Sequence, residues 1–496
     1  MPQTVHSQHD MVRAGEHFDV AVIGAGINGA GIARDAASRG LKVLLVDKND
    51  CGSGTSSAST RLIHGGLRYL EHFEFGLVRE SLREREILFR IAPHLVRPLP
   101  ITIPLYKQSK RGLLTIRAGM IAYDLLSWNK SLPHHRMLSR DETLARTSGL
   151  NPEGLVGSAL YFDAQVEFAE RLVLENVLAA RASGAEVLTH TAVTKLVAEN
   201  GKASGIEFVS EGQKQFASAR VIVNAVGPWV DDLLEGAAAV SASLIGGTKG
   251  SHIVVAAFPG APATAIYLEA RSDARPFFII PWNGNYLIGT TDVRFEDDPD
   301  EVRSELWEID YLLSETNFAL PQAQLTRADV LYTYSGVRPL PATGEKNAES
   351  ITRRHFIREH PRLDNLLSII GGKLTTYRSL AEECVDLIFR KLERSAPPCT
   401  TASEVLPGAV NFASFAAGFG NERWLRVYGS RAGEVAQLAS RLNKNELAAE
   451  IVFAFETELA QTLADCFLRR TMIGLNRDLG LGALDAVAEI GKQFLG

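Results

Sequence analysis

The sequence predicts an α/β protein in which a discontinuous Rossmann-like domain is joined to a mixed-sheet domain and a C-terminal all-helical cap domain. First, an apolar run at 19–23 enters a glycine-rich turn at 24–31, and a helical stretch and a second apolar run at 43–46 follow. Second, strand-like segments of the same kind return in the middle and late parts of the chain. Third, the last hundred or so residues are rich in Ala, Leu, Glu and Arg with helical spacing.

The turn Gly24-x-Gly26-x-x-Gly29 lies directly between the first strand and a helix. Glycines let the backbone approach a pyrophosphate, and the positive end of the following helix favours its charge. Asp47 ends the second strand, where it can accept hydrogen bonds from a ribose diol. A lone glycine triplet would indicate only a turn. With these flanks in order, the segment predicts a dinucleotide site.

The nucleotide-binding pattern continues far downstream, so we expect this domain to be discontinuous. Residues 185–193 and 220–229 are predicted strands, and 366–376 are predicted to form a strand, a glycine turn and a helix start. Alternating segments at 240–335 are typical of a mixed or antiparallel sheet, where a substrate lid would lie. A proline-bearing linker at 397–408 precedes the helical region.

These patterns predict three units. The nucleotide-binding domain comprises residues 17–90, 150–240 and 335–396, the substrate-binding domain residues 91–149 and 241–334, and the C-terminal helical domain residues 400–496. Within the first unit, the charged segment from Arg79 to Arg90 is expected to be a solvated helix face, with Glu80 and Glu84 beside neighbouring arginines.

Composition excludes several function classes. With 52 basic and 58 acidic residues the net charge is −6, so no bulk attraction to nucleic acid is expected. The four cysteines are widely spaced and form no CxxC pair, which predicts neither a disulfide framework nor a metal site and fits a reducing cytoplasm. There is no apolar run of about eighteen residues and no signal-peptide core. We therefore expect a chain that is neither exported nor membrane-spanning.

The segment after the second strand favours a flavin over a nicotinamide cofactor. Residues 52–69 form a small, hydroxyl-rich loop that runs into Gly65-Gly66. Such a loop can lie along an extended cofactor and donate hydrogen bonds where bulkier side chains would clash. The alternative is a flexible linker, but linkers seldom end in an apolar helix start. The strand end at 224–227 and the turn at 371–376 would complete the cradle, the latter with a helix N-terminus.

FAD is therefore the expected cofactor. The residues expected to bind it are Gly24, Gly26, Ile27, Asn28, Gly29, Asp47, Lys48, Thr55, Ser56, Ser57, His64, Gly65, Gly66, Leu67, Val193, Ala225, Gly227, Trp229, Gly336, Arg338, Gly372, Lys373, Leu374, Thr375 and Thr376.

The chain resembles the FAD-dependent sn-glycerol-3-phosphate dehydrogenases of aerobic, respiratory metabolism. The resemblance covers nearly the whole chain and rests on residues 24–31, 55–71, 249–254, 288–292, 334–340 and 371–378. Leu468-Arg469-Arg470-Thr471 also resembles the helical cap domain of that family, whereas the first sixteen residues match nothing in it. One departure lies at 351–355, where an acidic residue usually follows the arginine.

The resemblance implies a phosphate-bearing substrate, sn-glycerol 3-phosphate. The sequence independently has cations beside the cofactor motifs, because Arg68, Arg338 and Lys373 each follow a glycine-containing segment predicted to line the flavin. Guanidinium forks and an ammonium group suit a dianionic phosphate. Arg353 is a fourth candidate. For any one of these residues the alternative is an ordinary salt bridge.

Oxidation of a secondary alcohol also needs a base for the hydroxyl proton, and histidine has the best-placed intrinsic pKa. His64 lies in the predicted flavin-lining turn, and His252 in a predicted strand, where a histidine is more often a core residue. Lys373 could stabilise the developing alkoxide.

The resemblance implies oxidation of glycerol 3-phosphate to dihydroxyacetone phosphate by hydride transfer to FAD, with the electrons passed to a membrane quinone. Two alternatives stay open: a glycerol-3-phosphate oxidase that uses oxygen and releases peroxide, and a non-catalytic flavoprotein redox sensor. A quinone partner requires a cytoplasmic protein held peripherally on the inner membrane surface; a homodimer is a further possibility. Residues 107–128 combine cations with an apolar helix and are the candidate contact, the alternative being a buried helix.

Overall fold

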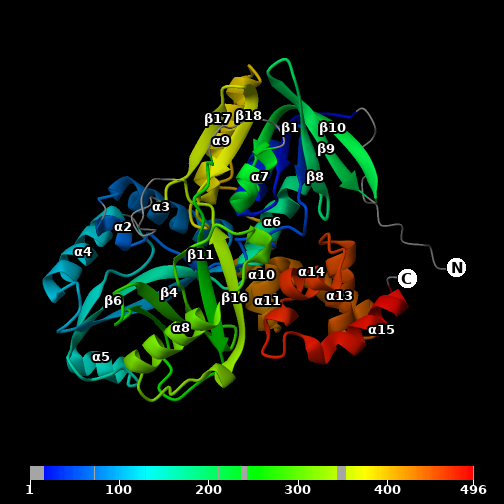
Figure 1. Cartoon of the computed structure of the whole chain (residues 1–496). Helices are drawn as coiled ribbons and strands as arrows, with labels where there is room; N and C mark the ends of the chain where they lie inside the picture. The colour runs from blue at the N-terminus through cyan, green and yellow to red at the C-terminus, as the bar shows by residue number, and fades with distance from the viewer. Residues whose placement is uncertain are drawn as a thin grey trace.

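Two β-sheets, the helices that cover them and a helical C-terminal domain make up the described part of the chain (Figure 1). This computed structural model describes residues 16–71, 73–128, 130–210, 212–235, 243–342 and 353–494, and the side chain of Arg68 lies outside the description. The α/β class with a helical C-terminal domain is confirmed.

The first sheet is the Rossmann-like part. Its main path runs β17-β18-β10-β1-β2-β7, in which all neighbours from β18 to β7 are parallel. The strands of this sheet are β1 (His17–Ile23), β2 (Val43–Val46), β7 (Glu186–Leu188), β8 (Ala192–Glu199), β9 (Lys202–Ser210), β10 (Gln213–Asn224), β17 (Phe356–His360) and β18 (Leu363–Ile370). They come from stretches far apart in the sequence, so the expected discontinuity is confirmed.

The packing of the first sheet shows where the turn between β1 and α1 lies. Helix α1 (Ile27–Ser38) contacts both α6 (Ala169–Ala182) and α9 (Tyr377–Lys391) on one face. Val20 and Val22 of β1 are buried in this layer, whereas Ala21 and Ile23 are buried with strand β9 and helix α7 (Val230–Glu235) on the other. The turn from β1 to α1 therefore lies at the carboxyl ends of parallel strands, the edge where such sheets bind ligands.

The second sheet is mixed, as the sequence predicts. Its path is β15-β11-β14-β13-β12-β4-β6-β3, with β16 beside β11 and β5 beside β6. Among the described strands of this second sheet, only β12 and β4 form a parallel pair. The strands are β3 (Leu62–Ile63), β4 (Val96–Tyr106), β5 (Arg136–Ser139), β6 (Leu155–Val166), β11 (Thr248–Val255), β12 (Ala265–Glu269), β13 (Pro276–Trp282), β14 (Asn285–Gly289), β15 (Val293–Arg294) and β16 (Val330–Arg338). The helices beside it include α2 (Arg68–Glu71), α3 (Phe75–Ile91), α4 (Leu113–Leu126), α5 (Arg140–Arg146) and α8 (Leu306–Ala319).

The C-terminal domain holds helices and no strand within the part of it that the structure describes, as predicted (Figure 1). Its α-helices are α10 (Phe412–Gly418), α11 (Glu422–Tyr428), α12 (Ala432–Arg441), α13 (Glu446–Glu456), α14 (Leu463–Asp465) and α15 (Leu484–Phe494). Residues Cys466–Arg470 form a π-helical turn directly after α14. Such turns are rare and often occur at functional positions.

Sheet membership differs from the expected domain ranges at three strands. Strands β3 and β6 fall within ranges assigned to the nucleotide-binding unit, but they pair with each other and β6 pairs along its length with β4 in the second sheet. Strand β16 crosses the expected boundary at residue 335 and pairs with β11. An apolar pattern identifies a strand, whereas its partner is decided by tertiary packing. The other boundaries stay predictions.

The segment 185–193 is not one strand. Strand β7 ends at Leu188 and β8 begins at Ala192, because His190 between them has a positive φ of 54°. The backbone N–H of His190 donates to the carbonyl of Asn49, and that of Thr191 to the carbonyl of Asp47. The break therefore ties this segment to the loop after β2.

The expectation of a solvated face for the charged segment is wrong for Glu84 and Arg85. Both side chains of α3 are buried, with 1% and 0% exposed. Glu84 binds Arg378 of α9 at 2.7 Å, and Arg85 binds Asp163 of β6 at 2.6 Å. The charges are buried because distant elements supply opposite charges.

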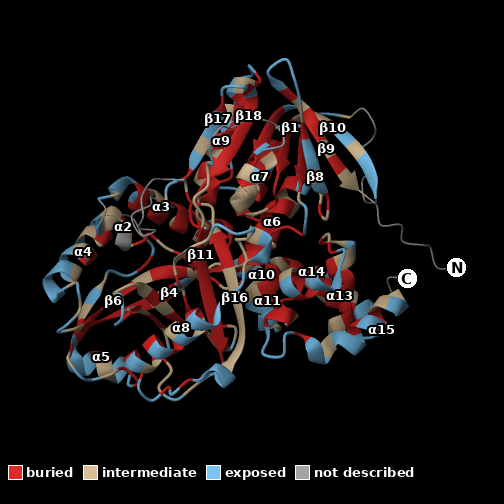
Figure 2. Cartoon of the chain, in the orientation of Figure 1, coloured by how far each residue is buried: buried red, intermediate tan, exposed pale blue. Residues whose placement is uncertain are grey.

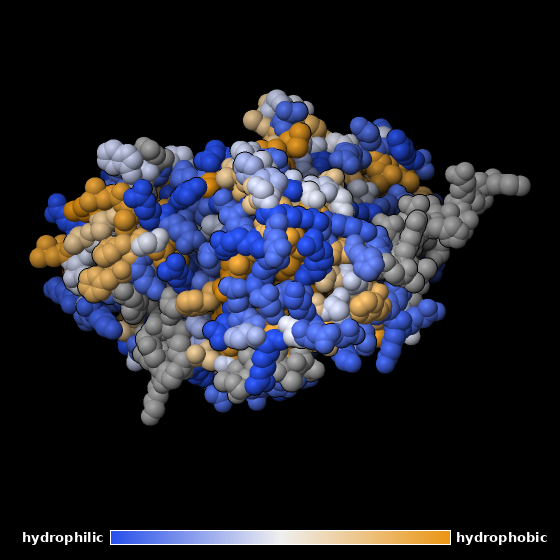
Figure 3. Space-filling model, turned by 90° about the horizontal axis from the view of Figure 1, so that it is seen from above, coloured by the Kyte–Doolittle hydropathy of each residue, from blue (hydrophilic) through white to orange (hydrophobic). Residues whose placement is uncertain are grey.

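Helix α4 is mostly exposed, which disfavours the buried-helix alternative for residues 107–128 (Figure 2). Only Met120 and Tyr123 of this helix are buried, whereas Leu114 and Leu125 are 79% and 65% exposed, and Trp128 beyond it is 80% exposed. Hydrophobic side chains gather at the left edge of Figure 3, the side on which α4 lies. Within the described ranges, no helix is both long and apolar enough to cross a bilayer.

Candidate active site

The glycine turn between β1 and α1 leaves no room for a Cβ at Gly24 or Gly29. Gly24 has a φ of +99°, and a Cβ there would lie 2.6 Å from the carbonyl oxygen of Ala225. A Cβ on Gly29 would lie 1.8 Å from the carbonyl oxygen of Gly24. Gly26 caps α1 without a side-chain hydrogen bond. Ile27 N donates to Ser56 Oγ at 3.0 Å, and the lack of side chains at Gly24 and Gly29 lets the backbone at this helix N-terminus approach an anionic ligand closely.

Asp47 lies at the end of β2, beside this turn. Its Oδ2 accepts a hydrogen bond from Ala25 N at 2.6 Å, and its Oδ1 accepts one from Asn49 N at 2.8 Å. Burial raises the pKa of Asp47 to about 6, while the two backbone donors oppose the rise. The carboxylate is thus oriented by the backbone and predominantly ionised at neutral pH, as a ribose-binding acid must be.

A groove extends from this turn along the carboxyl edge of the first sheet. Many residues expected to bind the cofactor line it, namely Gly24, Gly26, Ile27, Asn28, Asp47, Lys48, Thr55, Ser56, Val193, Ala225, Gly227, Trp229, Gly372, Lys373 and Leu374. Ser57 and Gly336 line an adjoining hollow. Gly29 lies beneath the turn. His64, Gly65, Gly66, Leu67, Arg338, Thr375 and Thr376 are not among the groove's lining residues.

The residues present fit FAD. Gly372 has a φ of +94°, and a Cβ there would lie 2.7 Å from Asn28 Nδ2, so the turn after β18 requires glycine where it meets α1. Asn28 Oδ1 is buried without a hydrogen-bond partner among the described residues, and Asn28 itself lines the groove. The glycine turn and the N-terminus of α1 suit the pyrophosphate of a dinucleotide, and Asp47 suits its ribose. The groups that would meet the flavin lie farther along, near Lys373.

The His64–Gly65 turn lies between β3 and α2, close to the turn after β18. His64 N donates to Thr375 Oγ1 at 3.2 Å, and Gly65 N donates to Tyr123 Oη at 3.0 Å. Desolvation, together with the charges of Lys373 and Arg353, lowers the pKa of His64 to about 4, although Asp163 opposes the change. The imidazole is therefore neutral at pH 7 and able to accept a proton.

Lysine and arginine side chains meet near this histidine. The Lys373 ammonium lies 3.8 Å from the centroid of the Tyr69 ring, and burial lowers the pKa of Lys373. Arg338 Nη1 lies 3.0 Å from Asp292 Oδ1, and Arg353 Nη2 lies 3.3 Å from Asp292 Oδ2. The two guanidinium groups thus converge on one carboxylate, which leaves an excess of positive charge among these four residues.

The structure does not place two of the predicted site residues in this group. The side chain of Arg68 lies outside the description, and only its backbone, at the start of α2, is placed. His252 is 1% exposed within β11, where its Nε2 lies 2.9 Å from Thr60 Oγ1 and its ring stacks on Tyr334. Burial lowers the pKa of His252 to about 3. This geometry favours the core-histidine alternative for His252.

The sequence interpretation missed Tyr69, Tyr123, Asp163 and Asp292. Asp292 ends the segment 288–292 that carries the family resemblance, and Tyr69 follows Arg68, so both stood in quoted motifs without a role. No local sequence motif marks Asp163 or Tyr123, because their partners lie far away in the sequence.

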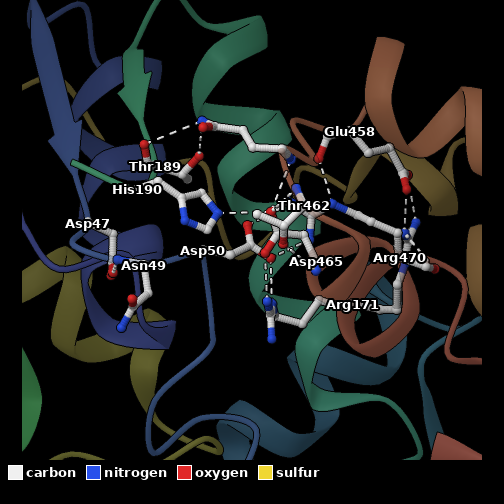
Figure 4. Close-up of polar contacts among 12 residues, drawn as sticks. Asp47, Asn49, Asp50, Arg171, Thr189, His190, Glu458, Thr462, Asp465 and Arg470 are labelled. Atoms are coloured by element: carbon white, nitrogen blue, oxygen red, sulfur yellow. Dashed lines mark hydrogen bonds and ion pairs between the residues drawn. The ribbon is translucent and has the colours of Figure 1, made fainter. Parts of the chain in front are cut away.

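The C-terminal domain contacts the loop that carries Asp47 through buried ion pairs (Figure 4). Arg470 binds Asp50 through two hydrogen bonds of 2.8 Å, and Arg469 binds the same carboxylate. Although burial opposes it, these arginines hold the pKa of Asp50 below its usual range. His190 Nε2 lies 2.8 Å from Asp465 Oδ2. The helical domain thus supports the loop after β2 and the segment between β7 and β8, which lie beside the groove near Asp47.

Comparisons with known proteins agree along nearly the whole chain. Residues 19–378 match the family described as FAD dependent oxidoreductase, and residues 399–496 match the C-terminal domain of alpha-glycerophosphate oxidase. The chain is 50% identical over 507 residues to a glycerol-3-phosphate dehydrogenase from Synechocystis sp., with 95% of this chain and 92% of the relative covered. It is 33% identical over 486 residues to the aerobic glycerol-3-phosphate dehydrogenase of Staphylococcus aureus, with 92% and 87% covered.

Two solved structures are similar to this chain in fold. The glycerol-3-phosphate dehydrogenase from Bacillus halodurans, complexed with FAD, is similar with a TM-score of 0.80 and 30% identity over 97% of this chain and 91% of that one. L-alpha-glycerophosphate oxidase from Mycoplasma pneumoniae shares the fold, with a TM-score of 0.61 and 20% identity over 79% of this chain and 99% of that one.

Proposed function

The chain belongs to the family of FAD-dependent glycerol-3-phosphate dehydrogenases, and on this premise we propose that it oxidises sn-glycerol 3-phosphate to dihydroxyacetone phosphate. The observation that carries the proposal is a neutral histidine, His64, close to the cations Lys373 and Arg353, where Lys373 lines the groove and Arg353 shares Asp292 with Arg338. A phosphate monoester with an oxidisable hydroxyl group needs both elements in one site.

We propose that Arg338, Arg353 and Lys373 bind the substrate phosphate. Arg338 also bonds to Thr290 Oγ1 at 3.1 Å, so its guanidinium group is held by both Thr290 and Asp292. Thr248 Oγ1 and the Thr291 carbonyl also accept from this guanidinium group, so its position is fixed and its positive charge suits a phosphate. The desolvated Lys373 ammonium gains most from an anionic ligand, because burial otherwise disfavours its charge.

We propose His64 as the base that takes the proton from the substrate hydroxyl at C2, while Lys373 stabilises the negative charge that develops on the oxygen. FAD, when bound, supplies the acceptor for the hydride from the same carbon. The bound phosphate would raise the pKa of His64 from its low value and bring it closer to the working pH. His252 would then support β11 beside the site rather than meet the substrate.

We further propose that the electrons pass to a membrane quinone and that α4 contacts the bilayer. Exposed apolar side chains on α4 and near it support this, since Leu114, Trp128 and Phe73 are each about four-fifths exposed. Lys107 and Lys110 lie exposed just before the start of α4. Arg111, in contrast, forms ion pairs with Glu71 and Glu269, so its charge is compensated within the protein. A cytoplasmic location at this membrane and a homodimer stay predictions.

An anaerobic titration tests the reaction. Glycerol 3-phosphate should bleach the flavin absorbance in proportion to the enzyme present, and added quinone should restore it. Bleaching that only oxygen reverses, with peroxide formed, would instead favour the oxidase alternative. No bleaching at any substrate concentration would favour the non-catalytic redox sensor.

A further inference from the structure

Tyr123 connects helix α4 to the His64–Gly65 turn. It is one of the two buried residues of α4 and is 3% exposed. Its hydroxyl lies 2.8 Å and 2.7 Å from the two carboxylate oxygens of Asp163 and accepts a hydrogen bond from Gly65 N at 3.0 Å. A single hydroxyl group therefore donates to a buried carboxylate and receives the backbone N–H that follows His64.

Asp163 of β6 is 1% exposed and is the centre of this arrangement. Arg85 of α3 binds its Oδ1 at 2.6 Å, and Gly65 N lies 3.4 Å from the same oxygen. Strand β6 and helices α3 and α4 thus converge on one carboxylate. Arg85 compensates its charge, which a buried carboxylate requires.

The turn sits directly on these side chains. A Cβ on Gly65 would lie 2.5 Å from Tyr123 Oη and 2.7 Å from Leu82 Cδ2. Any shift of the Tyr123 hydroxyl is therefore passed to the backbone of the turn. Thr375 Oγ1 holds His64 N from the other side, so the turn is fixed between the β18 turn and α4.

We propose that Tyr123 and Asp163 are positioning residues for the His64–Gly65 turn, and that the Asp163 carboxylate also acts electrostatically on the His64 imidazole. The other charged groups that act on His64 are Lys373 after β18, Arg353 before β17 and Arg85 on α3, all of them cations. Asp163 is the anion that opposes them. This inference rests on the proposed role of His64 as the base.

The test uses the holoenzyme and follows flavin reduction by glycerol 3-phosphate without oxygen or quinone, so that neither the acceptor nor a membrane enters. Tyr123→Phe removes the hydroxyl and should lower the limiting rate per bound flavin about tenfold, with the substrate concentration for half the limiting rate changed less than about twofold. Tyr161→Phe is the matched control, since Tyr161 is also buried and packs edge-on against the Tyr123 ring. It should reduce its flavin at the wild-type rate.

Asp163→Asn separates positioning from a structural role. It should lower the rate about 30-fold and, because it removes the negative charge that favours the imidazolium, move the acid limb of the pH profile down by about one unit. Tyr123→Phe keeps the carboxylate and should leave that limb in place. Brief pH jumps in a stopped-flow instrument keep the enzyme folded during the measurement.

Wild-type rates per bound flavin in Tyr123→Phe would overturn the inference, as would an unmoved acid limb in Asp163→Asn. If Tyr123→Phe does not fold with flavin, the pH profile of Asp163→Asn decides. A failure of the proposed function looks different, because the wild-type enzyme itself would then not reduce its flavin with glycerol 3-phosphate.

Discussion

Arg470 of the C-terminal domain binds Asp50 of the nucleotide loop with Nη1 and Nη2 each 2.8 Å from a carboxylate oxygen, and both side chains are fully buried. Asp50 follows Asp47 closely in the same loop, so the helical domain holds the segment that carries Asp47, the acid expected to bind the ribose. The pair links two parts of the protein that are 420 residues apart in sequence.

Arg470→Met should destabilise the holoprotein by about 3–5 kcal/mol, because it leaves the Asp50 carboxylate buried and under-compensated. Arg469 still binds Asp50, which should keep the loss toward the lower figure. Urea unfolding followed by circular dichroism measures this, and flavin fluorescence should show earlier FAD release. Lys492→Met, which breaks the exposed pair with Glu489, is the control and should change nothing measurable. Equal stability of the two variants would contradict the prediction.

Arg338→Ala and Lys373→Ala should retain flavin but lose substrate turnover. Each removes a charge-assisted contact to the phosphate, a loss of about 2–5 kcal/mol in transition-state stabilisation. The measurement is kcat/KM for glycerol 3-phosphate with an artificial dye as acceptor. Arg327→Ala removes an arginine of the exposed pair with Asp310 and serves as control. Wild-type turnover of either variant at low substrate would exclude that residue from the phosphate site.

FAD should be released intact by acid or heat, because no histidine or cysteine is expected to form a covalent link. Cys51 and Cys384 are buried, and burial raises the pKa of both thiols, which disfavours their reaction. Precipitation with trichloroacetic acid should leave yellow colour in the supernatant. Flavin that stays with the denatured chain would show a covalent bond.

Stability should fall as the pH is lowered from about 6.5, because buried histidines must stay neutral in the folded state. Burial lowers the pKa of His94 to about 3, so between its unfolded value and 3 the unfolded chain binds a proton that the folded chain does not. His94 alone should cost about 2 kcal/mol between pH 6.5 and 5. Asp47, whose pKa is raised to about 6, acts in the opposite direction.

His94→Gln isolates the contribution of His94 to the pH dependence of stability. Comparing urea midpoints at pH 7 and pH 5 should show a smaller loss in the variant than in the wild-type protein. An identical loss in both would mean that His94 is already protonated in the folded protein at pH 5.

Local sequence signals predicted strands β1 and β2 and the glycine turn between β1 and α1 well, because the constraints there act between near neighbours. Gly29 packs on the carbonyl of Gly24, and the sequence spacing alone carries that information. The prediction of a solvated charged face on α3 was wrong for Glu84 and Arg85, because their partners are distant in the sequence. The partners of Arg85 and Glu84 lie 78 and 294 residues away, and no periodicity within the helix shows that a distant strand or helix will supply the opposite charge.

Exchange of the exposed cations Lys107, Lys110 and Arg117 for glutamate should abolish binding to anionic vesicles and quinone-linked activity, while dye-linked activity stays unchanged. Each cation near an anionic surface contributes about 1 kcal/mol, so reversing three of them overcomes reversible binding. Arg111 is left intact because its ion pairs with Glu71 and Glu269 are structural. The control reverses Lys202, Lys214 and Lys444, which are exposed on β9, on β10 and between α12 and α13. Vesicle binding that survives in the first variant, or is lost in both, would mean that the surface around α4 is not the membrane contact.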